Sequence, residues 1–284
     1  MVLAFAAAIA AVALLASVIA RDASNFTPNT VTPVPVTVAD LEALSQLADY
    51  GTVTWTKQPS FQIVTSPSDA AAVAGGLKPP VVSNLPKGVS TNVTYAAMSQ
   101  ATAVFTFSAD KAGASAVKNG KTLPALPKGM DGAQLTVTVG PAVGEIFGNL
   151  QQPQQQQGQQ SGGSDATQLN LPQLVVGVSS APVATSTQVT VKQMENYLLT
   201  VPGISKELKA AIKAIGDPST TLPIPIPVQY ATSSTVTVQG VKGVALGDNT
   251  GVGAGVIWLK GGEVYVVAGT IKQSDAIKIA NNLK

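Results

Sequence analysis

The chain of 284 residues contains neither cysteine nor histidine. The absence of cysteine excludes disulfide bonds, a thiolate nucleophile, cysteine-ligated metals and a lipid-modified N-terminal cysteine. The absence of histidine removes the usual general base, the Ser-His-Asp triad and the commonest metal ligand. The 15 acidic residues are scattered and form no recognisable pair of the kind that glycoside hydrolysis needs. The sequence therefore predicts a protein that is not an enzyme and that has no metal, cofactor or catalytic site.

Charged residues are also scarce, at 11% of the chain against about 25% in a typical soluble protein. Lys and Arg total 17, Asp and Glu total 15, and Arg21 is the single arginine. So weak a net charge does not steer a protein toward nucleic acid, and the arginine needed for bidentate phosphate contacts is nearly missing. The polar surface must come from Thr, Ser, Gln and Asn, a composition that favours a secreted β-rich protein.

One long uncharged run is present, at the start of the chain. Met1 to Ala20 carries no charge, and as a helix it would reach roughly 30 Å, the thickness of a bilayer's hydrocarbon core. We predict a transmembrane helix or signal anchor at 1–20, which makes the chain a single-pass protein of the cell membrane with its bulk extracytoplasmic. A cleaved signal peptide ending at Ala20 and a buried helix of a soluble protein remain alternatives. Because Arg21 alone would favour a cytoplasmic C-terminus, we expect cytoplasmic basic residues upstream in the natural chain.

The composition changes twice after this segment. Residues 21–37 are rich in Pro and Thr and are predicted to form an extended tether. Residues 151–164 combine Gln with Pro, Gly and Ser, cannot bury apolar surface and are predicted to be disordered. Neither flank of this tract makes a complete domain, so we interpret it as a loop within one extracytoplasmic domain over 38–284, whose flanking strands pair. An interdomain linker is the alternative.

Strand-like runs and isolated amphipathic helices alternate along the domain. Helices are predicted at about 38–49, after a cap at Ser66, at about 190–200 with Thr190 as cap, after Ser205 and after Ser274. Strands are predicted at Val53–Thr56, Phe61–Val64, Thr91–Ala97, Ala101–Ser108, Ala133–Val139, Ala142–Phe147, Gln173–Ser179, Val236–Val238, Gly243–Leu246, Gly253–Leu259 and Glu263–Ala268. This alternation predicts an α+β fold with one long antiparallel sheet of roughly 8–12 strands and about five helices.

Proline marks two further local features. Residues 222–228 have Pro at every second position, so every second amide is missing on one edge, and we predict an edge strand or polyproline II. The sequence Leu-Pro-Lys-Gly occurs at 85–88 and again at 126–129, each time before a strand-like run. Pro at its second and Gly at its fourth position fit a type I turn. We interpret it as one turn used twice, with an internal duplication as the alternative.

Two tryptophans are the candidate ligand-binding residues. Trp55 and Trp258 both lie in predicted strands and are candidates for lining an apolar ligand pocket. As core residues on strands the two tryptophans need no special role, and this is the favoured interpretation.

The C-terminal pattern resembles a known group of proteins. Gly255 to Thr270 gives a Trp strand, a turn and a Tyr strand ending near Gly, and a short amphipathic helix follows to Leu283. With the earlier step from Ala70–Gly76 to the first Leu-Pro-Lys-Gly, this resembles a family of uncharacterised bacterial extracytoplasmic domains behind one membrane helix, related to anti-sigma-factor C-terminal domains and lipoprotein-carrier-like folds. The resemblance implies a curved antiparallel sheet with helices packed on its concave face, behind one N-terminal transmembrane helix. The zinc-binding module of anti-sigma factors is missing, since it would need His and Cys.

Two functions follow as hypotheses. The first is a non-enzymatic, membrane-anchored sensory or regulatory (anti-sigma-like) domain of the bacterial cell envelope that binds another envelope protein. The alternative is a periplasmic or cell-surface carrier that holds a lipid or other apolar ligand between sheet and helices. In both, residues 1–20 contact the membrane and nucleic acid is not a partner. The carrier needs an empty apolar cavity, whereas the regulatory domain needs only a filled core.

Overall fold

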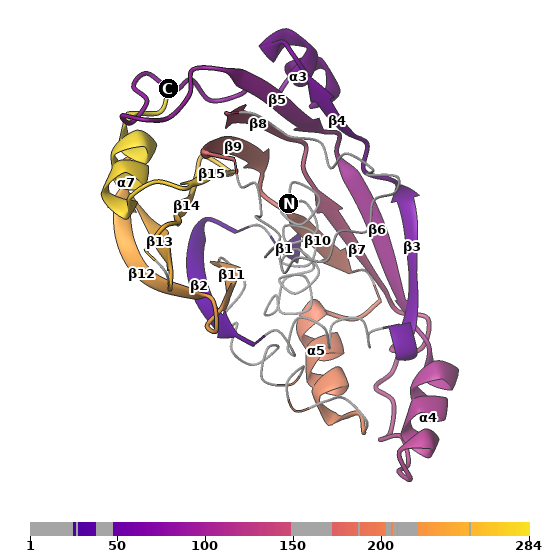
Figure 1. Ribbon diagram of the computed structural model, residues 1–284. Helices are drawn as coiled ribbons and strands as arrows, with labels where there is room; N and C mark the ends of the chain where they lie inside the picture. The colour runs from indigo at the N-terminus through magenta and orange to yellow at the C-terminus, as the bar shows by residue number, and fades with distance from the viewer. Residues whose placement is uncertain are drawn as a thin grey trace, which may run out of the picture.

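The computed structural model describes residues 25–26, 28–37, 48–148, 172–186, 188–202, 206, 209, 221–249 and 251–284. Within them the chain forms a sheet-rich α+β fold, in which a large curved antiparallel sheet dominates and few helices pack around it (Figure 1). The predicted α+β class with a long antiparallel sheet is thereby confirmed. The predicted segments at 1–20 and 151–164, and nearly all of the helices predicted at 38–49 and after Ser205, lie outside the described residues.

Among the helices of the described ranges, none has the length and apolar character needed to cross a membrane.

Four long strands run through the width of the sheet, and each is interrupted once. Their segments in chain order are β3 (Gly51–Lys57) and β4 (Phe61–Val64), β5 (Val93–Met98) and β6 (Ala101–Phe107), β7 (Gln134–Val139) and β8 (Ala142–Phe147), and β9 (Leu174–Ser180) and β10 (Val183–Ser186). Three of the interruptions contain Pro59, Pro141 or Pro182, which cannot donate to a strand ladder. The sheet is therefore creased along one line into a five-stranded and an eight-stranded part.

The eight-stranded part is completed by a C-terminal meander. Its strands are β12 (Ala231–Val238), β13 (Val241–Asp248), β14 (Ala254–Lys260) and β15 (Glu263–Gly269), and the strand order is β12-β13-β14-β15-β9-β8-β5-β4. The predicted hairpin at Gly261-Gly262 is confirmed, because Lys260 pairs with Glu263 across it. The five-stranded part has the order β1 (Asn25–Phe26), β10, β7, β6 and β3.

A separate two-stranded parallel ribbon lies inside the curve of the sheet (Figure 1). It pairs β2 (Thr30–Val36) with β11 (Thr221–Pro227) in register along their whole length. The amide of Val228 donates to the carbonyl of Val36, so the even-numbered residues of β11 face β2 and its prolines face away. The prediction of an edge strand at 222–228 is thus confirmed.

The structure of β2 corrects the prediction of a tether at 21–37. Residues 30–36 were expected in an extended tether, yet Val31, Val34 and Val36 are buried in the core. The physical reason is that β2, like β11, has prolines at alternate positions, which leaves one edge able to pair. In each strand the prolines lie on one edge only. The two strands therefore form their ladder hydrogen bonds through the edges that carry no proline.

The helices lie on both sides of the sheet. α3 (Pro67–Val73) and α7 (Gln273–Asn282) lie on the outer, convex side (Figure 1) and bury small or apolar side chains there. α5 (Val191–Thr200) instead joins the inner cluster of β2 and β11, and α4 (Ala109–Lys118) contributes Ala112 to the same cluster. The implied placement of helices on the concave face is therefore wrong for α3 and α7. For α7 the reason is that the ribbon occupies the concave side of β13 and β14.

Helix starts follow their caps. The hydroxyl of Ser66 accepts a hydrogen bond from the amide of Asp69 at the start of α3, as predicted. Thr190 and Gln193 form a capping box at the start of α5, also as predicted. α7 begins at Gln273, before the expected cap Ser274, and has no side-chain cap.

Both Leu-Pro-Lys-Gly sequences are turns, but each closes one residue later than predicted. The amide of Val89 donates to the carbonyl of Pro86, and Met130 does the same to Pro127, each at 3.1 Å. Gly88 has φ of 93° and the equivalent glycine at 129 has 79°. A positive φ at the third position fits a type II turn rather than type I, and glycine adopts it without strain.

The strands that flank the Gln-rich tract pair as predicted, with Phe147 opposite Leu174 in the antiparallel pair of β8 and β9. We expect that replacing 151–164 by a short Gly-Ser turn changes the free energy of unfolding by less than about 1 kcal/mol, because doubling a loop costs only about 0.6 kcal/mol. Urea unfolding of the two chains measures this. Limited proteolysis in the tract that releases two independently folded halves would contradict the one-domain interpretation.

Candidate functional site

Trp258 belongs to a filled core. Its side chain is 0% exposed and stacks on Tyr265, with ring centroids 5.2 Å apart and planes at 12°. The stacked pair lies on the outer face, where Ala276 and Ile279 of α7 pack in the same cluster. The prediction that Trp258 lines a ligand pocket is therefore wrong, because α7 covers the face on which its strand places it.

Trp55 lies on the opposite face of the sheet. It pairs across the ladder with Ala103, which pairs with Val137 of the inner cluster, so its side chain is on the concave side. Trp55 and Trp258 thus lie on different faces and do not share a pocket.

Trp55 is part of an exposed apolar stripe, the inner rim, which we define as Val53, Trp55 and Ile63. Their side chains are 42%, 41% and 48% exposed. All three stand on the concave face of the end strand formed by β3 and β4, since Val53 is opposite Phe105 and Ile63 is opposite Ala96. In the sequence, the alternation of Val53 and Trp55 with threonines is the pattern that indicates that these two side chains share one face of the strand.

A row of small residues leads inward from the rim. Ile63 pairs with Ala96, which pairs with Gly144, which in turn pairs with Gly177. Neighbouring strands lie about 4.8 Å apart, so these three small residues span about 10 Å of the concave face without a side chain larger than a methyl group. We call this row the small-residue track. A Cβ on Gly144 would lie 3.1 Å from the carbonyl oxygen of Val176, so the track depends on glycine there.

The outer face of the five-stranded part has a different character. Its outward positions, which we call the threonine face, are Thr52, Thr54 and Thr56 of β3, Thr102, Val104 and Thr106 of β6, Thr136 and Thr138 of β7, and Val183 and Thr185 of β10. Beyond the bulge of β3, Lys57 is opposite Thr102, and the Nζ of Lys111 donates to the hydroxyl of Thr52 at 3.1 Å, so the β3 side of this face carries positive charge. The hydroxyl oxygens of Thr102 and Thr138 lie 3.3 Å apart. None belongs to a hydrophobic cluster of the described core.

Glu145 is a buried carboxyl in the layer between the sheet and the outer helices. It stands between Tyr95 and Val176 in the ladder and is 9% exposed. Its Oε2 has no hydrogen-bond partner within the described structure. Burial raises the pKa of Glu145 from 4.5 to about 7, and burial together with the charge of Glu145 raises the pKa of Tyr95. In the sequence, this buried carboxyl is indicated only by a single acidic residue within an otherwise apolar strand.

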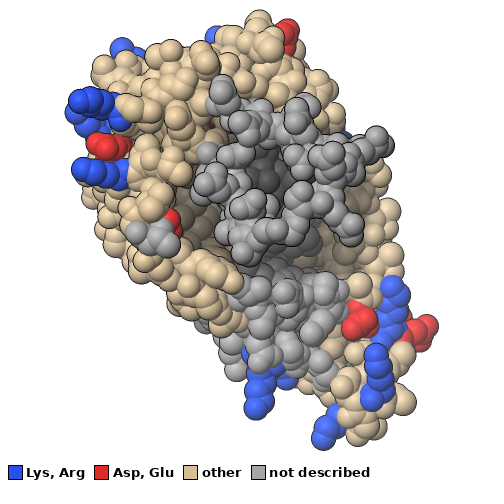
Figure 2. Space-filling model, in the orientation of Figure 1, with Lys and Arg blue, Asp and Glu red and all other residues tan. Residues whose placement is uncertain are grey.

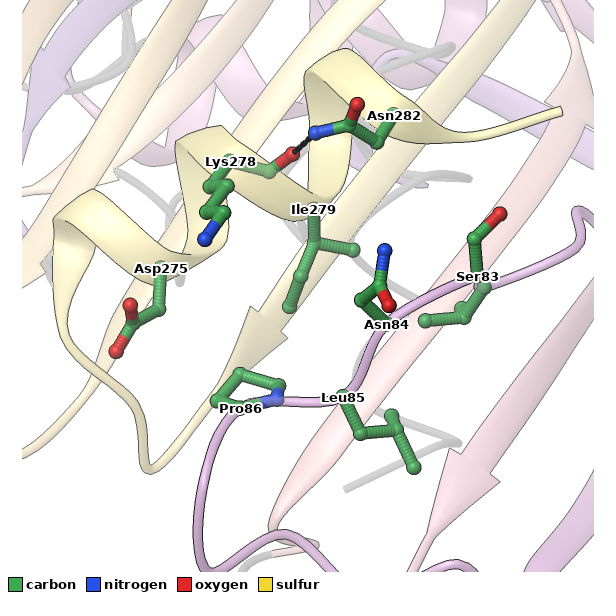
Figure 3. Close-up of a pocket in the computed structure, with 9 residues that line it drawn as sticks. Ser83, Asn84, Leu85, Pro86, Asp275, Lys278, Ile279 and Asn282 are labelled. Carbon is green, nitrogen blue, oxygen red and sulfur yellow. Dashed lines mark hydrogen bonds between the residues drawn. The ribbon is translucent and has the colours of Figure 1, made fainter.

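A small cleft lies on the outer side, between α7 and the segment from Val82 to Pro86 (Figure 3). Asp275 and Lys278 flank it, and the side chain of Asn282 donates to the carbonyl of Lys278 at 2.7 Å. Its volume of about 80 Å³ is well below the roughly 300–1,000 Å³ of ligand pockets. The cleft is therefore a packing irregularity and not the candidate site.

Charge does not mark a site either. Charged side chains gather over α4 and on the side where α7 lies (Figure 2). Among the residues that the structure describes, no three His, Cys, Asp or Glu side chains come together to hold a metal ion. The inner rim and the small-residue track are thus the best candidate site.

Comparison with known protein families, curated proteins and solved structures finds no match to this chain.

Proposed function

We propose that this chain is a non-enzymatic extracytoplasmic domain, held at the cell membrane by residues 1–20, that binds an apolar ligand on its concave face. This is the carrier function, and the inner rim is the observation that carries it. Large apolar side chains that share one exposed face of a protein make that face a candidate binding surface. Val53 and Trp55 are exposed here on the concave face of β3, and Ile63 is exposed on the same face of β4, eight residues further along the chain.

The shape and chemistry of the site favour a hydrocarbon chain. The small-residue track runs inward from Ile63 and consists only of Ala and Gly, all three of them buried, so it offers no hydrogen-bonding side chain to a sugar or a nucleotide. A row of Ala and Gly without hydrogen-bonding side chains suits an acyl chain better than a polar ligand. The ligand class is therefore a fatty acid or the acyl chain of a lipid.

Photo-crosslinking tests this function. We expect a diazirine fatty acid to label β3, β4 and β5 of the full chain held in a lipid nanodisc. Trp55→Glu should lower this labelling at least tenfold, because a carboxylate at the rim must be desolvated against hydrocarbon. The matched control is Val117→Glu on α4, where an apolar side chain 73% exposed is replaced away from the rim. Equal labelling of the two variants, measured by mass spectrometry, would contradict the proposal.

The threonine face supports the other function, a sensory or regulatory (anti-sigma-like) domain that binds an envelope protein. Threonine offers both hydroxyl hydrogen bonds and methyl contacts, and a face whose charge is confined to its β3 side can pack against a protein surface while burying little charge. A partner docked on the outer face would not touch Trp55, so its binding would be insensitive to Trp55→Glu. That difference separates the two functions.

A further inference from the structure

Among the described strands, β12 forms an open edge of the eight-stranded part. It stands at the end of the strand order and has β13 as its one ladder partner in the described part of the chain. Its eight residues include no charge and no proline, and Thr232 to Thr235 are all exposed. Edge strands with these properties are templates for pairing with another chain.

The other free edges carry protection. In the ribbon of β2 and β11, prolines at alternate positions remove the outward amide donors except those of Val31 and Thr221. The strand at the opposite end of the sheet has a bulge between Trp55 and Lys57, and Pro59 interrupts it. β1, which ends the five-stranded part, is only two residues long. β12 has none of these devices.

The hairpin turn shows which backbone groups face outward. Gln239 and Gly240 have φ of 48° and 83°, as a type I′ turn requires, and such a two-residue turn is closed by a hydrogen-bonded pair, here Val238 and Val241. Hydrogen-bonded and non-hydrogen-bonded pairs alternate along an antiparallel ladder. The even-numbered residues of β12 therefore bond to β13, and Ser233 and Thr235 direct their amides and carbonyls to the free edge.

We propose that β12 pairs antiparallel with β12 of a second copy of this chain, about a twofold axis at Ser234. In this register Ser233 of each copy forms a hydrogen-bonded pair with Thr235 of the other, and Ala231 pairs with Thr237. The two Ser234 residues face each other as a non-hydrogen-bonded pair. The strand is self-complementary because it has no charge to repel its copy. This inference is independent of the ligand proposed above.

Single cysteines test the register, because the chain has no cysteine of its own. The Cα atoms of a non-hydrogen-bonded pair lie about 4.5 Å apart, within the roughly 4.4–6.8 Å that a disulfide spans. In nanodiscs, we expect the full chain with Ser234→Cys to form disulfide-linked dimers on mild oxidation at least tenfold more than Thr232→Cys. Thr232 is the matched control because it is exposed on the same face of the same strand but meets Val236 in this register.

A backbone variant tests the mechanism of pairing. Thr235→Pro removes one outward amide and leaves the ladder from β12 to β13 intact. Added to Ser234→Cys, it should abolish the cross-link while leaving the circular dichroism spectrum unchanged. Equal cross-linking at Ser234 and Thr232 would overturn the proposal. So would a chain that stays uncross-linked at Ser234, or one in which an extended peptide of another protein occupies the edge.

Discussion

Replacing Trp258 by alanine is expected to lower the free energy of unfolding by about 3–5 kcal/mol, the range found for removing a large aromatic side chain from a core. Trp258 has no exposed surface, and among the fully buried side chains of the described core it has the largest volume. Its ring is held between Tyr265 within the sheet and the residues of α7 above it. The cavity left by alanine cannot close without moving α7, which is also tied to Gln239 through the carbonyl of Ala280.

The same substitution at Trp55 is the matched control. Because Trp55 stands at an exposed sheet edge, Trp55→Ala should lower the free energy of unfolding by less than about 1 kcal/mol. Urea unfolding of both variants under the same conditions, followed by circular dichroism, measures the difference. Similar losses at the two positions would contradict the assignment of Trp258 to the filled core and Trp55 to the rim.

Local signals located most of the described strands. Phe61–Val64 and Ala142–Phe147 have the predicted bounds, because alternation of side chains and nearby Pro or Gly define a strand within a few residues. β2 escaped prediction because its prolines indicate a tether when the segment is taken alone. Its partner β11 is distant in sequence, and only their juxtaposition shows that the two blocked edges complement each other.

The candidate site was predicted only in part. The alternation within each strand determines which residues share a face, as for Val53 and Trp55. The alternation cannot determine which face of the sheet α7 covers. Because α7 packs on the outer face, Trp258 is in the core, whereas Trp55 on the concave face stays exposed at the rim. The small-residue track was hidden for a related reason, since Gly144 and Gly177 become neighbours only through the pairing of β8 with β9.

The stability of the folded chain is expected to depend on pH through Glu145. In the folded state burial raises its pKa from 4.5 to about 7, so between these values the folded chain holds a proton that the unfolded chain has released. The stabilisation from this proton is complete below about pH 4.5 and is lost as the pH rises through 7. A difference of this size corresponds to about 3 kcal/mol. Tyr95, the neighbouring titratable group, has a raised pKa and stays neutral throughout this range.

Glu145→Gln isolates this effect, because it keeps the shape of the side chain and removes the titration. We expect the variant to match the parent chain near pH 4.5 and to exceed it in free energy of unfolding by about 2–3 kcal/mol at pH 8, where the parent must bury a carboxylate whose Oε2 lacks a partner. Asp110→Asn, an exposed acid of α4, is the control for removing a negative charge outside the core. Urea unfolding at pH 4.5, 6 and 8 gives the three profiles. If the profiles of Glu145→Gln and the parent run parallel, Glu145 ionises in the folded chain as it does in the unfolded one, and the burial of its carboxyl has no energetic consequence.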